Sequence, residues 1–596
     1  MKKITVKYTL LAVILLIVAG CKKGFLDQVP DDRITIEEIF SRKRTTEEYL
    51  ANVYSYVRDE SNQWQSNPWT GASDEADMTW ARSGYNSYFM NIGSWDPTSG
   101  FFDFWMDYYK GIRSATYFME NADKCKEILD QPGGADIIKR YKAEARFLRA
   151  YFYFGLLRQY GPVPLLGESI LAPDVPFDQT QIPRSSYDDC VNFIASELDR
   201  AGQDLPLQQS DELEYGRITR PVAMAVKARM LLYAASPQFN GNADYASFTN
   251  QDGQPLVSTT YDVNKWKKAA DAAKAVIDLN LFQLYKVNDG SGVYDPFTSC
   301  RDAVMSPWNK EVIFARAGNG VDQWEVHCSP RFAGGWSGVG ATQQMVDAFF
   351  MENGKAIDET GSGYVPSGFS TTDTRYTTAG TYNMYVGREP RFYVCITYNG
   401  MTWFNRSEGE KKVELFNTGN TGKRGTYDYS RTGYLVRKNY HPDTYPRLSR
   451  YVYRPFVLFR LAEMYLNYAE ALNESQPGNA DILKYVNAIR ERAGIPALPG
   501  GLPQADMRER IRRERRVELA FECHRYFDTR RWKIAEQTDG GPFYGMDVDA
   551  GTSLTDLSFY KKTVFETRVF QKKHYLFPIP QSEIDRNKKL VQNPGW

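Results

Sequence analysis

The chain has 596 residues, of which 42% are hydrophobic, 14% aromatic and 24% charged. This is enough apolar side chain to build a core, so a largely disordered protein is excluded, and the length suffices for several domains or one extended repeat assembly. The 73 basic residues balance the 73 acidic ones, which leaves no electrostatic basis for binding nucleic acid. The single long apolar run, at the N-terminus, excludes a protein with several membrane spans.

Residues 1–20 have the pattern of a secretory signal. Three lysines precede an apolar stretch from Tyr8 to Ala19, which is short for a membrane span. The small residues that follow lead directly to Cys21, an order that resembles a bacterial lipobox, in which the cysteine is lipidated and becomes the new N-terminus. Two or more acyl chains anchor a protein stably. We therefore expect a lipoprotein signal peptide at 1–20 and lipidation of Cys21; the alternative is an ordinary signal peptide with an incidental cysteine.

Helical patterns dominate two regions of the chain. Small residues alternate with aromatic ones in 143–155, 225–234 and 461–472, which lets helices approach closely. These three stretches resemble tetratricopeptide-type helix pairs, although insertions interrupt a regular repeat. The predicted helices cover 136–160, 221–235, 264–278, 455–473, 480–493 and 504–533.

The stretch 354–433 is rich in turn residues and contains short β-branched and aromatic runs, such as 391–398. It predicts loops with a few short strands. The predicted fold class is therefore mostly α, with tetratricopeptide-like helical repeats and a loop-rich insertion face that carries a few short β-strands.

The charged segment 510–533 is better interpreted as a packed structural helix than as a nucleic-acid-binding one. Its apolar residues follow helical spacing, and His524 lies on this stripe. Opposite charges four residues apart predict two ion pairs, Glu509 with Arg513 and Arg510 with Glu514.

No motif predicts a catalytic, cofactor or metal site. The chain has four histidines without a His-x-x-x-His pair, and it has neither a G-x-S-x-G elbow nor a Walker loop. Carboxylate pairs of glycoside hydrolases follow no local spacing rule, so a hydrolase stays open. Six cysteines follow Cys21 without a CxxC spacing, and we expect most of them to be free and buried, at 125, 190, 300, 328, 395 and 523.

Tryptophans gather in two turn-rich windows, 64–105 and 308–336. A surface indole offers a flat apolar face and one N–H donor, which suits the C–H face of a sugar ring with polar neighbours to bind hydroxyls. The alternative for each ring is packing inside the protein. The candidate ligand-binding residues are Trp80, Arg82, Tyr85, Asp74, Asp77, Trp324 and Trp336.

Four segments together resemble the SusD/RagB family of outer-membrane nutrient-binding lipoproteins of Bacteroidetes-type bacteria. They are CKKGFLD at 21–27, the repeat-helix sequence at 143–166, IRRERRVELAFECHRYFDTRRWK at 511–533 and LFPIPQSEIDRNKKLVQNPGW at 576–596. Cys523 departs from the pattern, since the family usually has glycine there.

The resemblance implies one body over 21–596, with repeat helices and the first aromatic loops in 21–290, a loop-rich insertion in 291–450 and a SusD/RagB-type region in 451–596. It implies an outer-membrane lipoprotein on the extracellular side that binds a glycan without catalysis and covers a SusC-like TonB-dependent barrel, with the repeats contacting the barrel. Some members bind peptides instead. A surface glycoside hydrolase and a lid without ligand contact remain further alternatives. Because the family's ligand-binding face varies, the candidate residues rest on the tryptophan windows alone.

Overall fold

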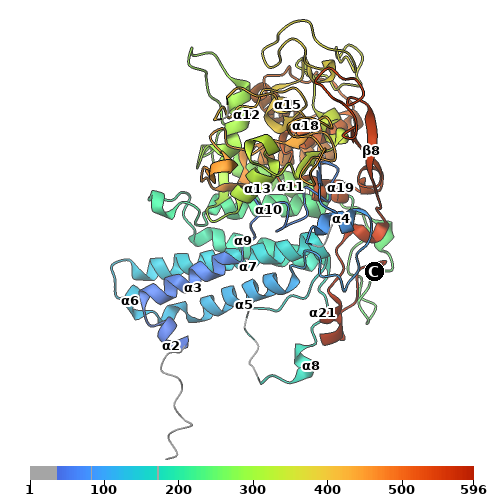
Figure 1. Ribbon diagram of the computed structural model, residues 1–596. Helices are drawn as coiled ribbons and strands as arrows, with labels where there is room; N and C mark the ends of the chain where they lie inside the picture. The colour runs from blue at the N-terminus through green and yellow to red at the C-terminus, as the bar shows by residue number, and fades with distance from the viewer. Residues whose placement is uncertain (1–35, 82–83, 169, 171–173, 408) are drawn as a thin grey trace, which may run out of the picture.

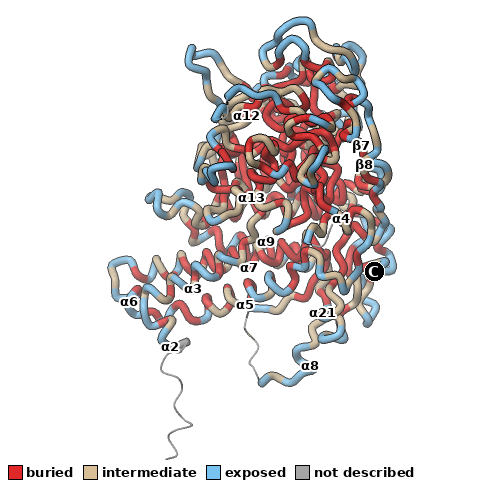
Figure 2. Tube along the Cα trace, in the orientation of Figure 1, coloured by how far each residue is buried: buried red, intermediate tan, exposed pale blue. Residues whose placement is uncertain are grey.

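The computed structural model describes residues 36–81, 84–168, 170, 174–407 and 409–596. A layer of long helices forms the lower half of the molecule in Figure 1, and a loop-rich body lies above it. Buried residues run through both parts (Figure 2). Among the residues described, none of the helices has the length and apolar character needed to cross a membrane. The predicted signal peptide, Cys21 and Arg82 lie outside the described residues.

The long helices pack in series, each against the next one along the chain, which confirms the predicted tetratricopeptide-like arrangement. After α11 the chain leaves the layer, forms most of the upper body, and returns with α16, which packs directly on α11. The helices of this series are α3 (Lys43–Ser55), α5 (Trp105–Asn121), α7 (Gly134–Tyr160), α9 (Tyr187–Asp204), α10 (Arg220–Ala235), α11 (Val263–Ile277), α16 (Leu461–Ser475), α17 (Ala480–Arg492) and α18 (Gln504–Glu518).

Glycines opposite aromatic rings let α5 and α7 approach closely. A Cβ atom built on Gly155 of α7 would lie 2.6 Å from the Tyr108 ring of α5, and one on Gly111 of α5 would lie 2.8 Å from the Phe152 ring of α7. Any larger side chain at either glycine would therefore separate the two helices. The sequence predicted that aromatic rings pack against small residues between the helices, and this contact shows such packing.

Short helices occupy the rest of the chain. They are α2 (Ile36–Ile39), α4 (Asn86–Asn91), α6 (Lys126–Leu129), α8 (Phe177–Thr180), α12 (Pro296–Met305), α13 (Val321–Cys328), α14 (Gln343–Ala348), α15 (Pro390–Cys395), α19 (Arg525–Arg531), α20 (Ala535–Thr538) and α21 (Gln581–Arg586).

The described part of the chain contains four antiparallel strand pairs. The first three join segments that lie far apart in the sequence, whereas the two strands of the last pair follow each other along the chain. Three of them connect the insertion internally or to the segments before and after it. The pairs are β1 (Ala76–Met78) with β3 (Val339–Ala341), β2 (Val312–Arg316) with β6 (Phe456–Arg460), β4 (Ile396–Thr397) with β5 (Leu435–Val436), and β7 (Gly541–Met546) with β8 (Lys562–Arg568).

Three predicted elements are wrong in part. The helix predicted at 455–473 begins only at Leu461, because the residues before it pair with β2 as strand β6. The strand predicted at 391–398 is mostly helix α15, since Pro390 occupies its first turn, where proline favours a helix. The helix predicted at 504–533 is interrupted between α18 and α19.

The interruption depends on left-handed backbone conformations. Phe521 has φ 59° and Cys523 has φ 63°, values that end an α-helix and that glycine adopts most readily. Cys523 therefore adopts a left-handed conformation that glycine, the usual residue at this position in the family that the sequence resembles, adopts without strain. All six predicted cysteines of the described chain, including this one, are free and buried, which confirms that expectation.

A buried network of ion pairs centred on Glu518 holds the upper body on the repeats. The Glu518 carboxylate accepts hydrogen bonds from Arg460 at 2.6 Å, from Arg391 at 3.0 Å and from Arg492. These arginines come from β6, α15 and α17, and Glu518 ends α18. The network, which we call the Glu518 network, also contains Glu311, Glu389, Glu514, Glu522, Lys438 and Arg490.

The two ion pairs predicted within α18 are wrong. Glu509 pairs with Arg512 at 3.3 Å, and Arg513 lies 3.4 Å from Asp358. Glu514 instead binds Arg391 at 2.6 Å and Arg490 at 2.9 Å, and Arg510 binds Glu359. Burial alone would raise the pKa of Glu518, but Arg492, Arg460 and Arg391 hold it below its ordinary value. The segment is thus a packed, ion-paired structural element, as the sequence indicated.

A second buried acidic stretch, 74–77, leads into and through β1. Asp74 accepts hydrogen bonds from Arg516 and Arg525, each at 2.7 Å, which lowers its pKa to about 2 despite its burial. Glu75 accepts one hydrogen bond, from the Phe521 N–H at 3.0 Å, while its second oxygen has no hydrogen-bond partner among the described residues. Burial therefore raises the pKa of Glu75 to about 8.

Substituting Glu518 tests the network. Glu518→Gln leaves three buried arginines without their shared charge, so we expect a loss of about 3 kcal/mol or more in the free energy of unfolding. Because the pKa of Glu518 is lowered, its contribution is present above the ordinary glutamate pKa and is lost as pH falls; the acid sensitivity of the variant should be weaker. Urea denaturation at neutral and at acidic pH measures the loss of unfolding free energy and its dependence on pH. Glu509→Gln, at an exposed side chain, is the matched control, and a loss below about 1 kcal/mol in Glu518→Gln would contradict this role.

Glu75 predicts the opposite pH dependence. Between its ordinary pKa of 4.5 and the raised value of about 8, the folded protein binds one more proton at Glu75 than the unfolded chain. Stability must then fall as pH rises through this window. The glutamine in Glu75→Gln cannot ionise. The urea midpoint of this variant should therefore rise relative to that of the parent protein as the pH increases from about 5 to about 9. A difference that stays constant over this range would show that Glu75 is ionised throughout.

Candidate functional site

Strands β1 and β3 bring the two tryptophan windows together. Met78 pairs with Val339, and the ladder continues with a hydrogen bond from the Thr79 N–H to the Gly338 carbonyl at 3.0 Å. Trp80 directly follows this pairing on one side, and Trp336 precedes it by two residues on the other. The two indoles consequently meet edge to face, with ring centroids 6.4 Å apart and an interplanar angle of 84°.

Five rings form an aromatic cluster around this point: Trp64, Trp80, Tyr85, His327 and Trp336. His327 lies at its centre, stacked on Trp64 at 4.4 Å and edge-on to Trp336 at 4.7 Å. Burial lowers the pKa of His327 to about 4, so the ring is neutral at physiological pH. Its Nδ1 atom lies 2.6 Å from the Gln323 carbonyl and donates to it. His327 thus acts as a neutral aromatic spacer.

Trp336 is the ring of this cluster that reaches furthest into solvent. Trp336 is 43% exposed, whereas Trp80, which meets it edge to face, is 7% exposed. Trp80 is fixed by a hydrogen bond from its Nε1 to Asp428 Oδ1 at 3.2 Å, and its ring leaves no space for a side chain at Gly338, where a Cβ would lie 2.1 Å away. The supported ring of Trp336 is therefore a pre-organised flat apolar surface.

Asp428, which holds Trp80, and Arg331 provide polar groups near this surface. Tyr427, next to Asp428 in the chain, is 88% exposed. The backbone N–H of Arg331 donates to Ser337 Oγ at 3.1 Å, which keeps Arg331 next to the Trp336 turn, and the charge of Asp428 acts on its guanidinium. The surface thus combines flat apolar area with donors and acceptors.

The candidate residues from the sequence separate into two groups. Trp80, Tyr85 and Trp336 come together in the aromatic cluster, although Trp80 is buried there, which corrects the expectation that its ring lies at the surface. Trp324, Asp74 and Asp77 are buried, which corrects the expectation that they lie at the surface. Trp324 is 1% exposed and donates to the Lys438 carbonyl at 3.1 Å. The partners of these three residues are arginines and carbonyl groups from distant segments; Asp77, for example, lies 3.5 Å from Arg431. The local sequence does not reveal such contacts.

The sequence missed several residues of this surface. Trp64 lies in the first window but was not selected, and His327 was noted only as one of four scattered histidines. Asp428 lies in the turn-rich insertion, where only the fold brings it next to Trp80, and Tyr427 directly precedes it in the chain. Within the described residues, no group of three or more histidine, cysteine, aspartate or glutamate side chains is arranged to hold a metal ion.

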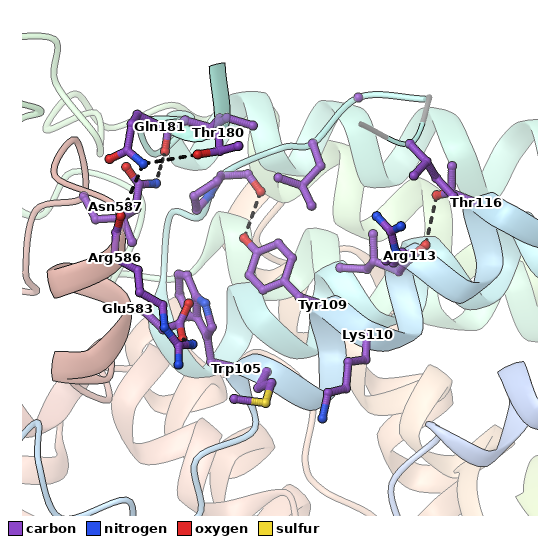
Figure 3. A pocket seen from close by; sticks show the side chains of 18 of the residues that line it. Trp105, Tyr109, Lys110, Arg113, Thr116, Thr180, Gln181, Glu583, Arg586 and Asn587 are labelled. Carbon is purple, nitrogen blue, oxygen red and sulfur yellow. Dashed lines mark hydrogen bonds and ion pairs between the residues drawn. The ribbon is translucent and has the colours of Figure 1, made fainter. Parts of the chain in front are cut away.

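A separate groove lies on the repeat layer between α5, α8 and α21. It has a volume of about 690 Å³ and largely apolar walls that include Trp105 and Tyr109. Figure 3 shows that its polar groups bind one another: the Tyr109 hydroxyl donates to the Pro164 carbonyl at 2.9 Å, and Gln181 donates to the Arg586 carbonyl at 3.2 Å. These groups are less available to select sugar hydroxyls than the side chains around Trp336.

Two family models match the chain. One, described as the SusD family, matches residues 310–596, and the other, described as starch-binding and associating with the outer membrane, matches residues 24–232. A SusD-like protein of Bacteroides ovatus is 23% identical over 99% of this chain and 97% of its own length. A SusD-like protein of Formosa agariphila is 32% identical over a shorter stretch of 149 residues, which is 24% of this chain and 26% of that protein.

A solved structure agrees with these matches. The crystal structure of a SusD-like protein from Bacteroides fragilis is 27% identical to the chain and covers 96% of it with 100% of its own length, at a TM-score of 0.75. Both the N-terminal part, 24–232, and the C-terminal part, 310–596, therefore match models of one family. The chain belongs to the SusD family.

Proposed function

We propose that the protein binds an oligo- or polysaccharide at the cell surface, without catalysis, and delivers it to a TonB-dependent outer-membrane transporter. The observation that carries this proposal is the exposed ring of Trp336, which Trp80 and His327 support edge-on from below. A flat, rigid indole of this kind offers contact area at little cost in conformational entropy. The family models, one of which is described as starch-binding, support a sugar as the ligand.

The binding step uses two kinds of contact. The C–H face of a sugar ring stacks on Trp336, and the polar groups of Arg331, Asp428 and Tyr427 hydrogen-bond the hydroxyls. Because Asp428 also holds Trp80, hydroxyl recognition and ring support share one carboxylate. The platform is open, so the internal sugars of a long chain can bind as well as its ends.

Delivery uses the helical part of the molecule. The repeat layer, which includes the apolar groove at α5, is proposed to contact a SusC-like barrel, while Cys21 carries the lipid anchor. A protein that hands its ligand on must also release it. We therefore expect weak to moderate affinity for the glycan.

Affinity electrophoresis tests the ligand class. The soluble protein starting after Cys21 is run in native gels that contain plant, host or microbial polysaccharides, and we expect retardation in one or two of them. New reducing ends in the same polysaccharide would identify a hydrolase instead. Retardation by none of them, together with saturable peptide binding, would favour the peptide alternative.

The platform itself is tested by Trp336→Ala in the gel that retards the parent protein. Loss of the stacking surface should weaken binding at least about tenfold, which corresponds to about 1.4 kcal/mol. The melting temperature should change little because the ring is half exposed. Tyr261→Ala, which removes an exposed ring from the repeat layer, is the matched control and should bind like the parent protein. Unchanged binding by Trp336→Ala would place the sugar elsewhere.

A further inference from the structure

A second cavity lies within the insertion, between α12, the loop around residue 376, and the β4–β5 pair. Its volume is about 480 Å³, within the range of small-ligand pockets, and none of the five rings of the aromatic cluster lines it. Five of the side chains that line it can determine what it binds: Asp295, Phe297, Arg375, Tyr376 and Arg437.

Arg437 is a buried cation without a counter-ion. Its residue is 8% exposed, yet no carboxylate of the described chain lies within ion-pair distance of it. Its side-chain hydrogen bonds within the protein are long: Nε to the Val394 carbonyl at 3.5 Å, and Nη1 to the Met401 sulfur at 3.7 Å. The guanidinium also lies over the rings of Phe404 and Phe297, at 5.4 and 5.7 Å from their centroids, which partly compensates the charge but accepts no conventional hydrogen bond. Burial lowers the pKa of Arg437 to about 10, so the guanidinium is still charged at neutral pH.

Two other buried arginines show that this situation is unusual for the protein. Arg388 donates to the Val346 carbonyl at 2.7 Å and to the Phe349 carbonyl at 2.8 Å. Arg184 is likewise held by backbone carbonyls, the shortest of these bonds at 2.8 Å. Arg184 and Arg388 therefore each donate several short hydrogen bonds to protein carbonyl groups, although Arg388 Nε has no partner among the described residues. Arg437 differs in having poor acceptors and a cavity beside it.

The other lining groups complete a site for an anion. The Tyr376 hydroxyl is buried without a hydrogen-bond partner in the described chain, so it too has a donor to offer. Arg375 forms an ion pair with Asp295 at 3.5 Å, which leaves Arg437 as the uncompensated charge of the lining. Phe297 supplies an apolar wall. A guanidinium binds planar or tetrahedral oxyanions through paired hydrogen bonds.

We propose that this cavity, the Arg437 cavity, binds the carboxylate or sulfate group of an acidic saccharide. The saccharide part rests on the proposed function; the anion part rests on Arg437 and Tyr376 alone. The cavity provides a charge, a hydroxyl and an aromatic wall, which match an oxyanion carried on a sugar ring. The ligand of the protein would then be an acidic glycan, a uronate or a sulfate ester.

Arg437→Met tests this with three probes: galacturonate, inorganic sulfate, and galactose as the uncharged counterpart. Galacturonate, sulfate or both should raise the melting temperature of the parent protein in an Arg437-dependent manner, and galactose should not. Only that Arg437-dependent part counts, because sulfate also stabilises proteins through exclusion from their surface. Galacturonate acting alone identifies a uronate, and sulfate acting alone a sulfate ester. Tyr376→Phe should weaken the shift.

A merely structural role for Arg437 makes a different prediction. Without ligand, Arg437→Met should melt at the temperature of the parent protein or above it, because an uncompensated buried charge is removed. Arg388→Met, which leaves carbonyl groups unpaired, should melt lower. A strongly destabilised Arg437→Met, or equal ligand shifts in the parent protein and Arg437→Met, would overturn the proposal.

Trp336→Ala separates this inference from the proposed function. It should lose retardation by polysaccharide but keep the galacturonate or sulfate shift. If no polysaccharide retards the protein while the Arg437-dependent shift is present, the platform fails and the anion site stands. If polysaccharides bind through Trp336 but neither anion has an effect that depends on Arg437, the Arg437 cavity is not a ligand site.

Discussion

The arrangement of the molecule depends on one buried carboxylate, Glu518, which three arginines share. Each arginine comes from a different element, so the network fixes the positions of β6, α15 and α17 against the end of α18. Ion pairs buried this deeply add little net stability compared with apolar packing, but removing one partner is costly. The network therefore specifies one geometry: it fixes how the insertion of loops and short strands sits on the layer of repeats, in addition to the apolar contacts between them.

The position of the aromatic surface also depends on contacts with the α18–α19 region. β1 is held to the α18–α19 interruption by Asp74 and Glu75, and β1 in turn pairs with β3. Trp80 lies two residues after the end of β1 and Trp336 three residues before the start of β3, so the ladder brings their rings together, and Asp428 of the insertion fixes Trp80 there. A ligand platform in a loop-rich region can thus be rigid, because the strands below it are bound to the core of the repeats.

The sequence predicted the elements that local pattern controls. The repeat helices, the free cysteines and the two tryptophan windows were evident, since periodicity and composition act over a few residues. It did not predict which tryptophans are exposed: Trp324 and Trp336 lie in the same turn-rich window, and only contacts with Lys438 or His327 distinguish them. The strand β6 and the interruption at Cys523 were missed for a related reason, because partners distant in sequence override helical propensity there. The unpaired charge of Arg437 is visible only once the fold shows which carboxylates are absent from its surroundings.

In this account the protein is a non-catalytic binding surface mounted on a scaffold of repeats, and its central claim is that sugar stacks on Trp336. The most direct measurement is a crystal structure of the protein soaked with an oligosaccharide derived from a polysaccharide that retards it. The account predicts a sugar ring parallel to the Trp336 indole, with hydroxyls in hydrogen-bond reach of Arg331, Asp428 or Tyr427. An oligosaccharide bound with no contact to Trp336 would contradict it.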